Sequence, residues 1–156
     1  MQFSQLFTPG NVFIDAFSQS KTAVFHRISE LLSANTPTLK LQDLFDAYWK
    51  RENLGSTAIG YGIIIPHIRT PLLKYPKACF IKLRHPVEFG AEDKQPADLV
   101  IGLASPQNQA ELHLIILNNL LERFSQPSFR KMCRSMNTSE SLYALLVNDI
   151  VEPVCA

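Results

Sequence analysis

The sequence predicts an α/β fold, a single domain in which helices flank a mixed central β-sheet. Two observations support this. Apolar residues recur at helical spacing in several segments, and short runs rich in β-branched residues lie between those segments. The chain has 156 residues, of which 46% are hydrophobic and 19% charged, a composition that suits one buried core. We therefore expect one domain over residues 1–150 and a short C-terminal tail over residues 151–156.

Two helices are predicted in the first third of the chain. Residues 20–34 and residues 39–53 each carry an apolar stripe on one face. Lys50 and Arg51 fall in the last turn of the second helix, where cations complement the helix dipole, and Gly55 is placed to end it. The stripes consist of Val24, Ile28, Leu31 and Leu32 in the first helix and Leu41, Leu44, Phe45 and Tyr48 in the second.

Strands are predicted in the middle of the chain. Residues 56–60 and 63–65 form two short β-like runs around Tyr61 and Gly62. Pro66 ends the second run, and His67 follows immediately at the end of that strand. Residues 78–83 and 97–104 are two further strands. The second of these contains the run Leu99-Val100-Ile101, which is typical of a strand buried on both faces.

The last third is predicted to be helical. From Gln109 onward, His113 shares a broad face with Ile116, Leu120 and other apolar residues. Pro127 begins a further helix, and Ser139 is placed to cap a last one.

Composition excludes several classes of function. The formal net charge is +1, and no dense basic tract is present, which argues against a nucleic-acid binder. No segment approaches the ~20 apolar residues of a membrane span, and the N-terminus lacks the pattern of a secretory signal, so we expect a cytoplasmic protein with no membrane insertion. The histidines are scattered and no CxxC pair occurs, so no metal site or cofactor is expected.

The chemistry is predicted in the segment from Gly55 to His67. It is rich in glycine, it begins with the hydroxyls of Ser56 and Thr57, and it ends in a histidine. A histidine at the end of a strand can act as a general base, a metal ligand or a nucleophile. As a nucleophile for phosphorus it would need nearby donors, which Ser56, Thr57 and Arg51 could supply. From the residues alone, His67 could equally be a loop histidine fixed by a carbonyl, and His113 a hydrogen-bonded packing residue.

The segment resembles the IIA domains of the bacterial phosphotransferase system, of the fructose/mannitol and nitrogen-regulatory type. That family shows a pattern of the form RE-x-LGSTGIG-x-G-x-x-IPH-x-[RK], and residues 51–69 match most of it. The resemblance extends to Leu6-Phe7-Thr8-Pro9 near the N-terminus, to Gln95-Pro96-Ala97-Asp98-Leu99-Val100 in the centre and to His113-Leu114. It covers nearly the whole chain.

The resemblance implies roles for particular residues. His67 aligns with the phosphorylated histidine, and Arg51 and His113 align with the two supporting residues of the family's site. Ser56 and Thr57, whose hydroxyls were noted above from the residues themselves, are expected to support the phosphoryl group. The implied protein is a phosphocarrier with a phosphohistidine intermediate, of the transferase class if it is counted as an enzyme. Its implied donor is an HPr- or NPr-like carrier, charged by an enzyme I that uses phosphoenolpyruvate.

The branch of the family is open at this point. A free-standing domain favours the nitrogen-regulatory type, whose implied partner is a regulatory target such as a kinase or transporter. The alternative is a sugar-transport component that passes phosphate to a IIB domain. Three positions depart from the family pattern, and one of them is Ile64, which stands where a small residue is common. Tyr61 stands where asparagine is common, and Ile68 stands where glycine is frequent, so that a positive φ there would strain Ile68.

Two other classes of function compete with the phosphocarrier. The domain could be a binding module that only docks a regulator, without phosphotransfer. It could also be a small hydrolase that uses His67 as a base, although no paired nucleophile is visible in the sequence.

Overall fold

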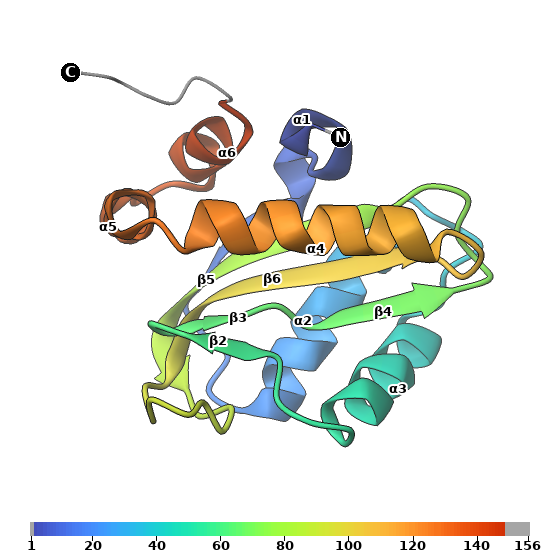
Figure 1. Cartoon of the computed structure of the whole chain (residues 1–156), viewed down its shortest axis with the longest axis horizontal. Helices are drawn as coiled ribbons and strands as arrows, with labels where there is room; N and C mark the ends of the chain where they lie inside the picture. Colours follow the sequence, from blue (N-terminus) through green and yellow to red (C-terminus); the bar gives the residue numbers. More distant parts are fainter. Residues whose placement is uncertain (1, 149–156) are drawn as a thin grey trace.

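The computed structural model describes residues 2–148, which form a six-stranded mixed sheet with helices on both faces (Figure 1). The strand order is β1-β5-β6-β3-β2, and β4 also pairs with β6. The predicted α/β class is therefore confirmed, whereas the expected tail at residues 151–156 lies outside the described residues. The strands are β1 (Val12–Asp15), β2 (Ala58–Gly60), β3 (Ile63–Ile64), β4 (His67–Thr70), β5 (Lys77–Val87) and β6 (Ala97–Pro106). The helices are α1 (Phe3–Leu6), α2 (Lys21–Ser33), α3 (Leu41–Glu52), α4 (Ala110–Phe124), α5 (Pro127–Ser135) and α6 (Ser139–Val147), with a 3₁₀ turn at Pro9–Asn11.

Two cores lie on opposite faces of the sheet. Alternate residues of β6 point to each side, so that Leu99 and Ile101 pack with residues of α4, α5 and α6, and Val100 packs with residues of α2 and α3. Residues 99–101 are fully buried, as predicted for a strand covered on both faces. Figure 1 shows α4 crossing one face of the sheet while α2 lies behind the other. Among residues 2–148, no helix is long and apolar enough to cross a bilayer.

The predicted helices are confirmed with small changes at their ends. Ser20 caps α2 by accepting a hydrogen bond from the Ala23 backbone N–H at 3.1 Å. The cap of α6 was predicted one residue too late, because Thr138 rather than Ser139 accepts the N–H of Ser141.

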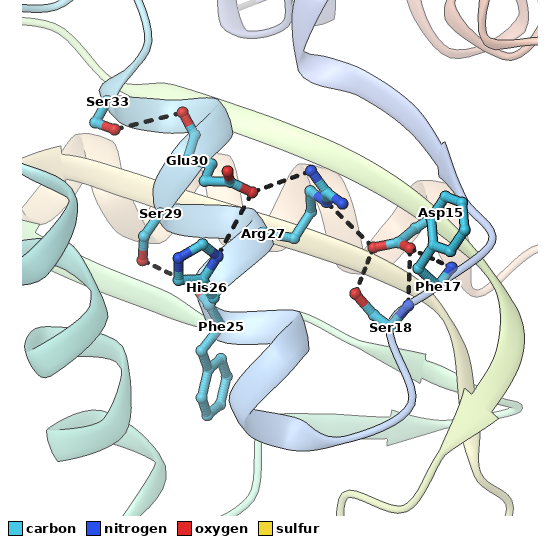
Figure 2. A network of polar contacts seen from close by, with 9 residues as sticks. All are labelled: Asp15, Phe17, Ser18, Phe25, His26, Arg27, Ser29, Glu30 and Ser33. Carbon is cyan, nitrogen blue, oxygen red and sulfur yellow. Dashed lines mark hydrogen bonds and ion pairs between the residues drawn. The ribbon is translucent and has the colours of Figure 1, made fainter.

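Strand β1 ends in a buried carboxylate that fixes the following turn. Asp15 is fully buried and accepts the backbone N–H groups of Phe17 and Ser18 at 2.8 and 2.9 Å (Figure 2). Burial alone would raise the pKa of Asp15, but the hydrogen bonds from Ser18, Phe17 and Arg27 outweigh it and lower that pKa. Arg27 also reaches Glu30 at 3.0 Å, so the network ties the end of β1 to the middle of α2.

The prediction that strand pairing ends at Pro66, with His67 directly after the strand, is wrong. Pro66 does interrupt a strand, but the chain resumes pairing at once as β4, and both β3 and β4 run parallel to β6. Ile64 pairs with Val100 and His67 pairs with Leu103, so the two short strands flank a single break beside β6. The site histidine is therefore the first residue of a strand that the central strand holds in register.

The expected strain falls on Tyr61 rather than on Ile68. Ile68 lies within β4, is buried, and is not among the described non-glycine residues with positive φ. Tyr61 has φ of +60° at the turn between β2 and β3. Asparagine, which the family often has there, tolerates this left-handed conformation better than tyrosine. Two arginines of α5 stabilise this turn. Arg134 donates a hydrogen bond to the Tyr61 carbonyl, and the Arg130 guanidinium lies 4.1 Å from the centroid of the Tyr61 ring.

Gly62 is a position where a side chain cannot fit. Its φ is +78°, and an added Cβ would meet the Arg134 guanidinium at 2.8 Å and an Asp98 carboxylate oxygen at 2.9 Å. We expect Gly62→Ala to lower the free energy of unfolding by about 2 kcal/mol, as urea denaturation would measure. Gly10→Ala is the matched control, because nothing lies within 4 Å of a Cβ there. Equal stability of the two variants would contradict the proposed tight contact.

Candidate functional site

The candidate site is built around His67 at the start of β4. The Nδ1 atom of His67 lies 2.7 Å from the carbonyl oxygen of Ile65, in the break between β3 and β4. A carbonyl can only accept, so Nδ1 carries the proton in this hydrogen bond. In the neutral ring the free lone pair is therefore on Nε2. The structure thus indicates which nitrogen could attack, which the sequence left open.

Burial keeps this ring neutral. The side chain of His67 is partly buried, and desolvation is the main cause that lowers its pKa below the ordinary value of 6.5. The hydrogen bond to Ile65 acts in the opposite direction, and the positive charge of Arg51 lowers the pKa further. At neutral pH His67 can therefore act as a nucleophile or base without first losing a proton.

Four of the five predicted site residues line one small cavity. It has a volume of about 180 Å³ and an apolar wall that α4 contributes through Leu117 and Leu121. The predicted residues in its lining are Arg51, Ser56, Thr57 and His67. Arg51 lies in the last turn of α3 and donates to the carbonyl of Gly55 at 2.9 Å, which orients the side chain along the loop toward β2.

The two predicted hydroxyls differ in their availability. The Ser56 hydroxyl donates to the carbonyl of Phe89 at 2.9 Å and accepts the Ala58 N–H at 3.1 Å. Its proton is therefore already engaged in a hydrogen bond within the protein. The Oγ1 atom of Thr57 is buried and has no hydrogen-bond partner among the described residues. A buried hydroxyl without a partner is costly unless something else completes it. Of the two hydroxyls, that of Thr57 is therefore the one whose hydrogen-bonding capacity is unused.

His113 lies against His67 rather than in the cavity lining. It is in the first turn of α4, and the centroids of the two imidazole rings are 5.5 Å apart at an angle of 50°. Its Nδ1 atom lies 2.7 Å from the hydroxyl oxygen of Ser105. Burial first, and then the neighbouring His67 and Arg69, lower the pKa of His113 to about 4. His113 is thus both a hydrogen-bonded, buried residue and a member of the histidine pair.

The free energy of unfolding should depend on pH because the pKa of His113 is lowered in the folded chain. Between pH 6.5 and about 4, the unfolded chain binds a proton at position 113 that the folded chain does not. Stability is therefore present above pH 6.5 and decreases as the pH falls through that window. We expect the urea midpoint to fall between pH 7 and pH 4.5, and the fall to be shallower in His113→Gln. An identical decline in both proteins would show that His113 does not cause it.

Two residues of the site were missed by the sequence reasoning. Arg69 affects the pKa of His113 and donates to the carbonyl of Gln107 at 3.2 Å; the final Arg of the quoted motif could have identified it. Ser105 contacts His113 from the end of β6, and no sequence pattern distinguishes it from other strand residues. Among the described residues, no group of three or more His, Cys, Asp or Glu side chains is placed to hold a metal ion.

A larger cavity, which also borders β2, has the wrong charge for an anion. Its volume is about 640 Å³, and its lining includes Tyr61, Glu92 and Asp93. Hydrogen bonds from the Tyr61 and Gln95 backbone N–H groups lower the pKa of Asp93, so that carboxylate is ionised. A phosphate would be repelled there, whereas the smaller cavity offers the guanidinium of Arg51 and the neutral imidazole of His67.

Three exposed leucines lie on or directly after the two helices that carry Arg51 and His113, and we call them the apolar rim. Leu54 and Leu114 are 81% and 59% exposed, and Leu121, at 39%, is also part of the cavity wall. Large exposed apolar residues beside polar groups are typical of a surface that binds another protein.

Comparison with known proteins gives consistent matches. The family model described as "Phosphoenolpyruvate-dependent sugar phosphotransferase system, EIIA 2" matches residues 5–149. The chain is 33% identical to a nitrogen regulatory protein of Pseudomonas aeruginosa over 95% of this chain and 96% of that one. It superposes on the crystal structure of the nitrogen regulatory protein IIA-Ntr of Neisseria meningitidis with a TM-score of 0.86 and 33% identity, covering 92% and 98% of the two chains.

A more distant match extends the fold comparison to a complex. The chain resembles the mannitol enzyme IIA in its complex with phosphorylated enzyme IIB from Escherichia coli, with a TM-score of 0.70 and 24% identity. This match covers 90% of this chain and 98% of that one. At 24% identity, this match supports a similar fold and no statement about the role of this chain.

Proposed function

Because the chain belongs to the EIIA 2 family of the phosphoenolpyruvate-dependent phosphotransferase system, and is similar to nitrogen regulatory proteins of that family, we propose that it accepts a phosphoryl group on Nε2 of His67. The observation that carries the proposal is the hydrogen bond from Nδ1 of His67 to the Ile65 carbonyl. It leaves Nε2 as the one ring nitrogen with a free lone pair. That ring borders a cavity that also contains a guanidinium and an unpartnered hydroxyl.

The transfer needs one bond to form and one to break. Nε2 of His67 forms a P–N bond as the bond between phosphorus and the donor histidine breaks, and the donor nitrogen keeps the bonding pair. The attacking ring gains positive character, which the Ile65 carbonyl stabilises by accepting the Nδ1–H hydrogen bond. Because the bond broken and the bond formed are of the same kind, the site mainly supplies position and electrostatics.

Three side chains are suited to the phosphoryl oxygens. Arg51 offers a planar set of N–H donors and a permanent positive charge. Thr57 offers the hydroxyl that has no partner among the described residues. His113, next to the His67 ring, offers a donor from a neutral imidazole. Arg51 offsets the negative charge of the phosphoryl oxygens, and the two uncharged groups can donate hydrogen bonds to them.

The donor that fits is a protein. An open cavity of about 180 Å³ with an apolar rim suits the approach of another protein's phosphohistidine better than full enclosure of a small phosphorylated metabolite. We propose an HPr- or NPr-like carrier as this donor and, because such carriers are charged inside the cell with phosphoenolpyruvate, the cytoplasm as the location.

A nitrogen-regulatory role is the branch that we propose. Its support is the match at 33% identity to relatives that carry this name and cover nearly the full chain. In this role, phosphorylation adds about −1.5 to −2 charges beside the apolar rim and changes which regulatory target, such as a kinase or transporter, can bind there. The alternative is a sugar-transport role with a IIB domain as acceptor, and its support is the description of the matching family model as part of a sugar phosphotransferase system.

Intact mass spectrometry tests the proposal. The purified chain, incubated with phosphoenolpyruvate, enzyme I and an NPr- or HPr-like carrier, should gain the mass of one phosphoryl group, and acid should remove it. A mixture without enzyme I is the control. If no carrier of either type phosphorylates the chain although a regulatory target still binds, the protein is a binding module and the proposal fails.

A further inference from the structure

A buried serine contacts the second histidine of the site. Ser105, near the end of β6, is fully buried, and its hydroxyl oxygen lies 2.7 Å from Nδ1 of His113. Strand pairing fixes its backbone, because Ser105 lies opposite Arg69 in the parallel pair of β4 and β6. The same pairing places His67 opposite Leu103. The serine and the first histidine are therefore held by one pair of strands, while His113 reaches them from α4.

Either Ser105 or His113 could donate this hydrogen bond, and the two directions differ in which polar group stays without a partner. If Nδ1–H of His113 donated to Ser105, the serine O–H would need another acceptor, and none is recorded for it among the described residues. If the serine O–H donates to Nδ1, the hydroxyl has its acceptor, and the Nε2 atom of His113 is not among the described buried atoms that lack a partner. A buried donor without a partner is the rarer and costlier case. The hydroxyl is therefore the donor.

This direction decides what His113 presents to the site. With a lone pair on Nδ1, the neutral ring carries its proton on Nε2. The Nε2–H group is then the ring's remaining polar group, next to an imidazole whose centroid is 5.5 Å away. In the other tautomer Nε2 would present a lone pair, which repels the oxygens of a phosphoryl group.

We propose that Ser105 is a positioning residue for phosphotransfer, which holds His113 in the Nε2–H tautomer so that it donates to the phosphoryl group on His67. This inference rests on the proposed function, because it assumes that His67 accepts the phosphoryl group. Ser105 touches neither reactant, and it acts only through His113. Partners of this kind, which fix the tautomer and orientation of a functional imidazole, typically contribute about 10- to 100-fold to activity or affinity.

Ser105→Ala tests the inference, with Ser29→Ala as the matched control. Ser29 is also fully buried and also donates its hydroxyl to a single partner, the Phe25 carbonyl at 2.8 Å, but it lies in α2. We expect Ser105→Ala to lower the rate of phosphotransfer from the carrier by about tenfold or more, whereas Ser29→Ala keeps the normal rate.

A ¹⁵N NMR measurement of the imidazole rings provides a readout that a purely structural role would not change. In the unphosphorylated wild-type protein at neutral pH, His113 should show a bare Nδ1 and a protonated Nε2. Ser105→Ala should change the proportion of the two tautomers at His113. A wild-type His113 protonated on Nδ1, or a Ser105→Ala variant that transfers at the normal rate, overturns the inference.

The two proposals fail in different ways. If wild-type protein cannot be phosphorylated at all, the proposed function is lost, and the role of Ser105 in transfer is lost with it. If wild-type protein is phosphorylated normally while Ser105→Ala behaves like wild type, only the Ser105 inference is lost.

Discussion

His67→Ala should gain no phosphoryl group under conditions in which the wild-type chain is fully modified. The reason is that no other described histidine combines a free ring nitrogen with the donors of the small cavity. His113 has its Nδ1 engaged with Ser105 and lies outside the cavity lining. Intact mass spectrometry measures the result directly.

Two further variants show whether the loss is specific. His85→Ala removes an exposed histidine of β5 and should be phosphorylated at the wild-type rate. His113→Ala should still be phosphorylated, but slowly, because it removes a supporting donor and keeps the nucleophile. A His67→Ala chain that gains one acid-labile phosphoryl group would show that the acceptor lies elsewhere.

The predictable part of the fold depended on local patterns. The periodicity of Val24, Ile28 and Leu32 defined α2, and Ser20 marked its first turn, because capping and amphipathic spacing operate within a few residues. The apolar run 99–101 likewise identified the central strand. Such features do not require knowledge of the chain's distant segments.

The missed strands depended on distant partners. The strand β1 has four residues, and its pairing is with Phe80 to Leu83 in β5, far along the chain. A run this short has little pattern of its own. For β4, Pro66 was interpreted as the end of a strand, although pairing with β6 resumes at His67. The proline breaks the ladder locally, and the long neighbouring strand restores it.

In the candidate site, too, the residues that are close in sequence could be predicted, and the contacts between distant segments could not. The residues of the segment from Gly55 to His67 could be found from the sequence, since they are close together along it. The contact between His67 and His113 came from family resemblance, because folding alone brings α4 to the start of β4. No sequence rule could have shown that the Ser56 hydroxyl is already used by Phe89, or that Ser105 contacts His113.

Arg51 provides the second large effect that we expect. Its guanidinium borders the cavity, and its charge acts on His67 strongly enough to contribute to the lowered pKa of that ring. The same charge would stabilise the phosphoryl oxygens during transfer. Loss of one preorganised donor of this kind typically costs about 10²- to 10³-fold in rate. We therefore expect Arg51→Ala to slow phosphotransfer by two to three orders of magnitude, roughly the range that such donors contribute.

Stability measurements separate this effect from a structural one. The only hydrogen bond recorded for the Arg51 side chain among the described residues is to the Gly55 carbonyl, so its loss should cost about 1 kcal/mol or less in free energy of unfolding. Lys50→Ala, in the same turn of α3 but exposed, should change neither rate nor stability. Arg51→Lys should fall between wild type and Arg51→Ala, because it keeps the charge and loses the planar set of donors. If Arg51→Ala unfolds in mild urea while its folded fraction transfers at the normal rate, Arg51 holds the loop before β2 and does not act on the phosphoryl group.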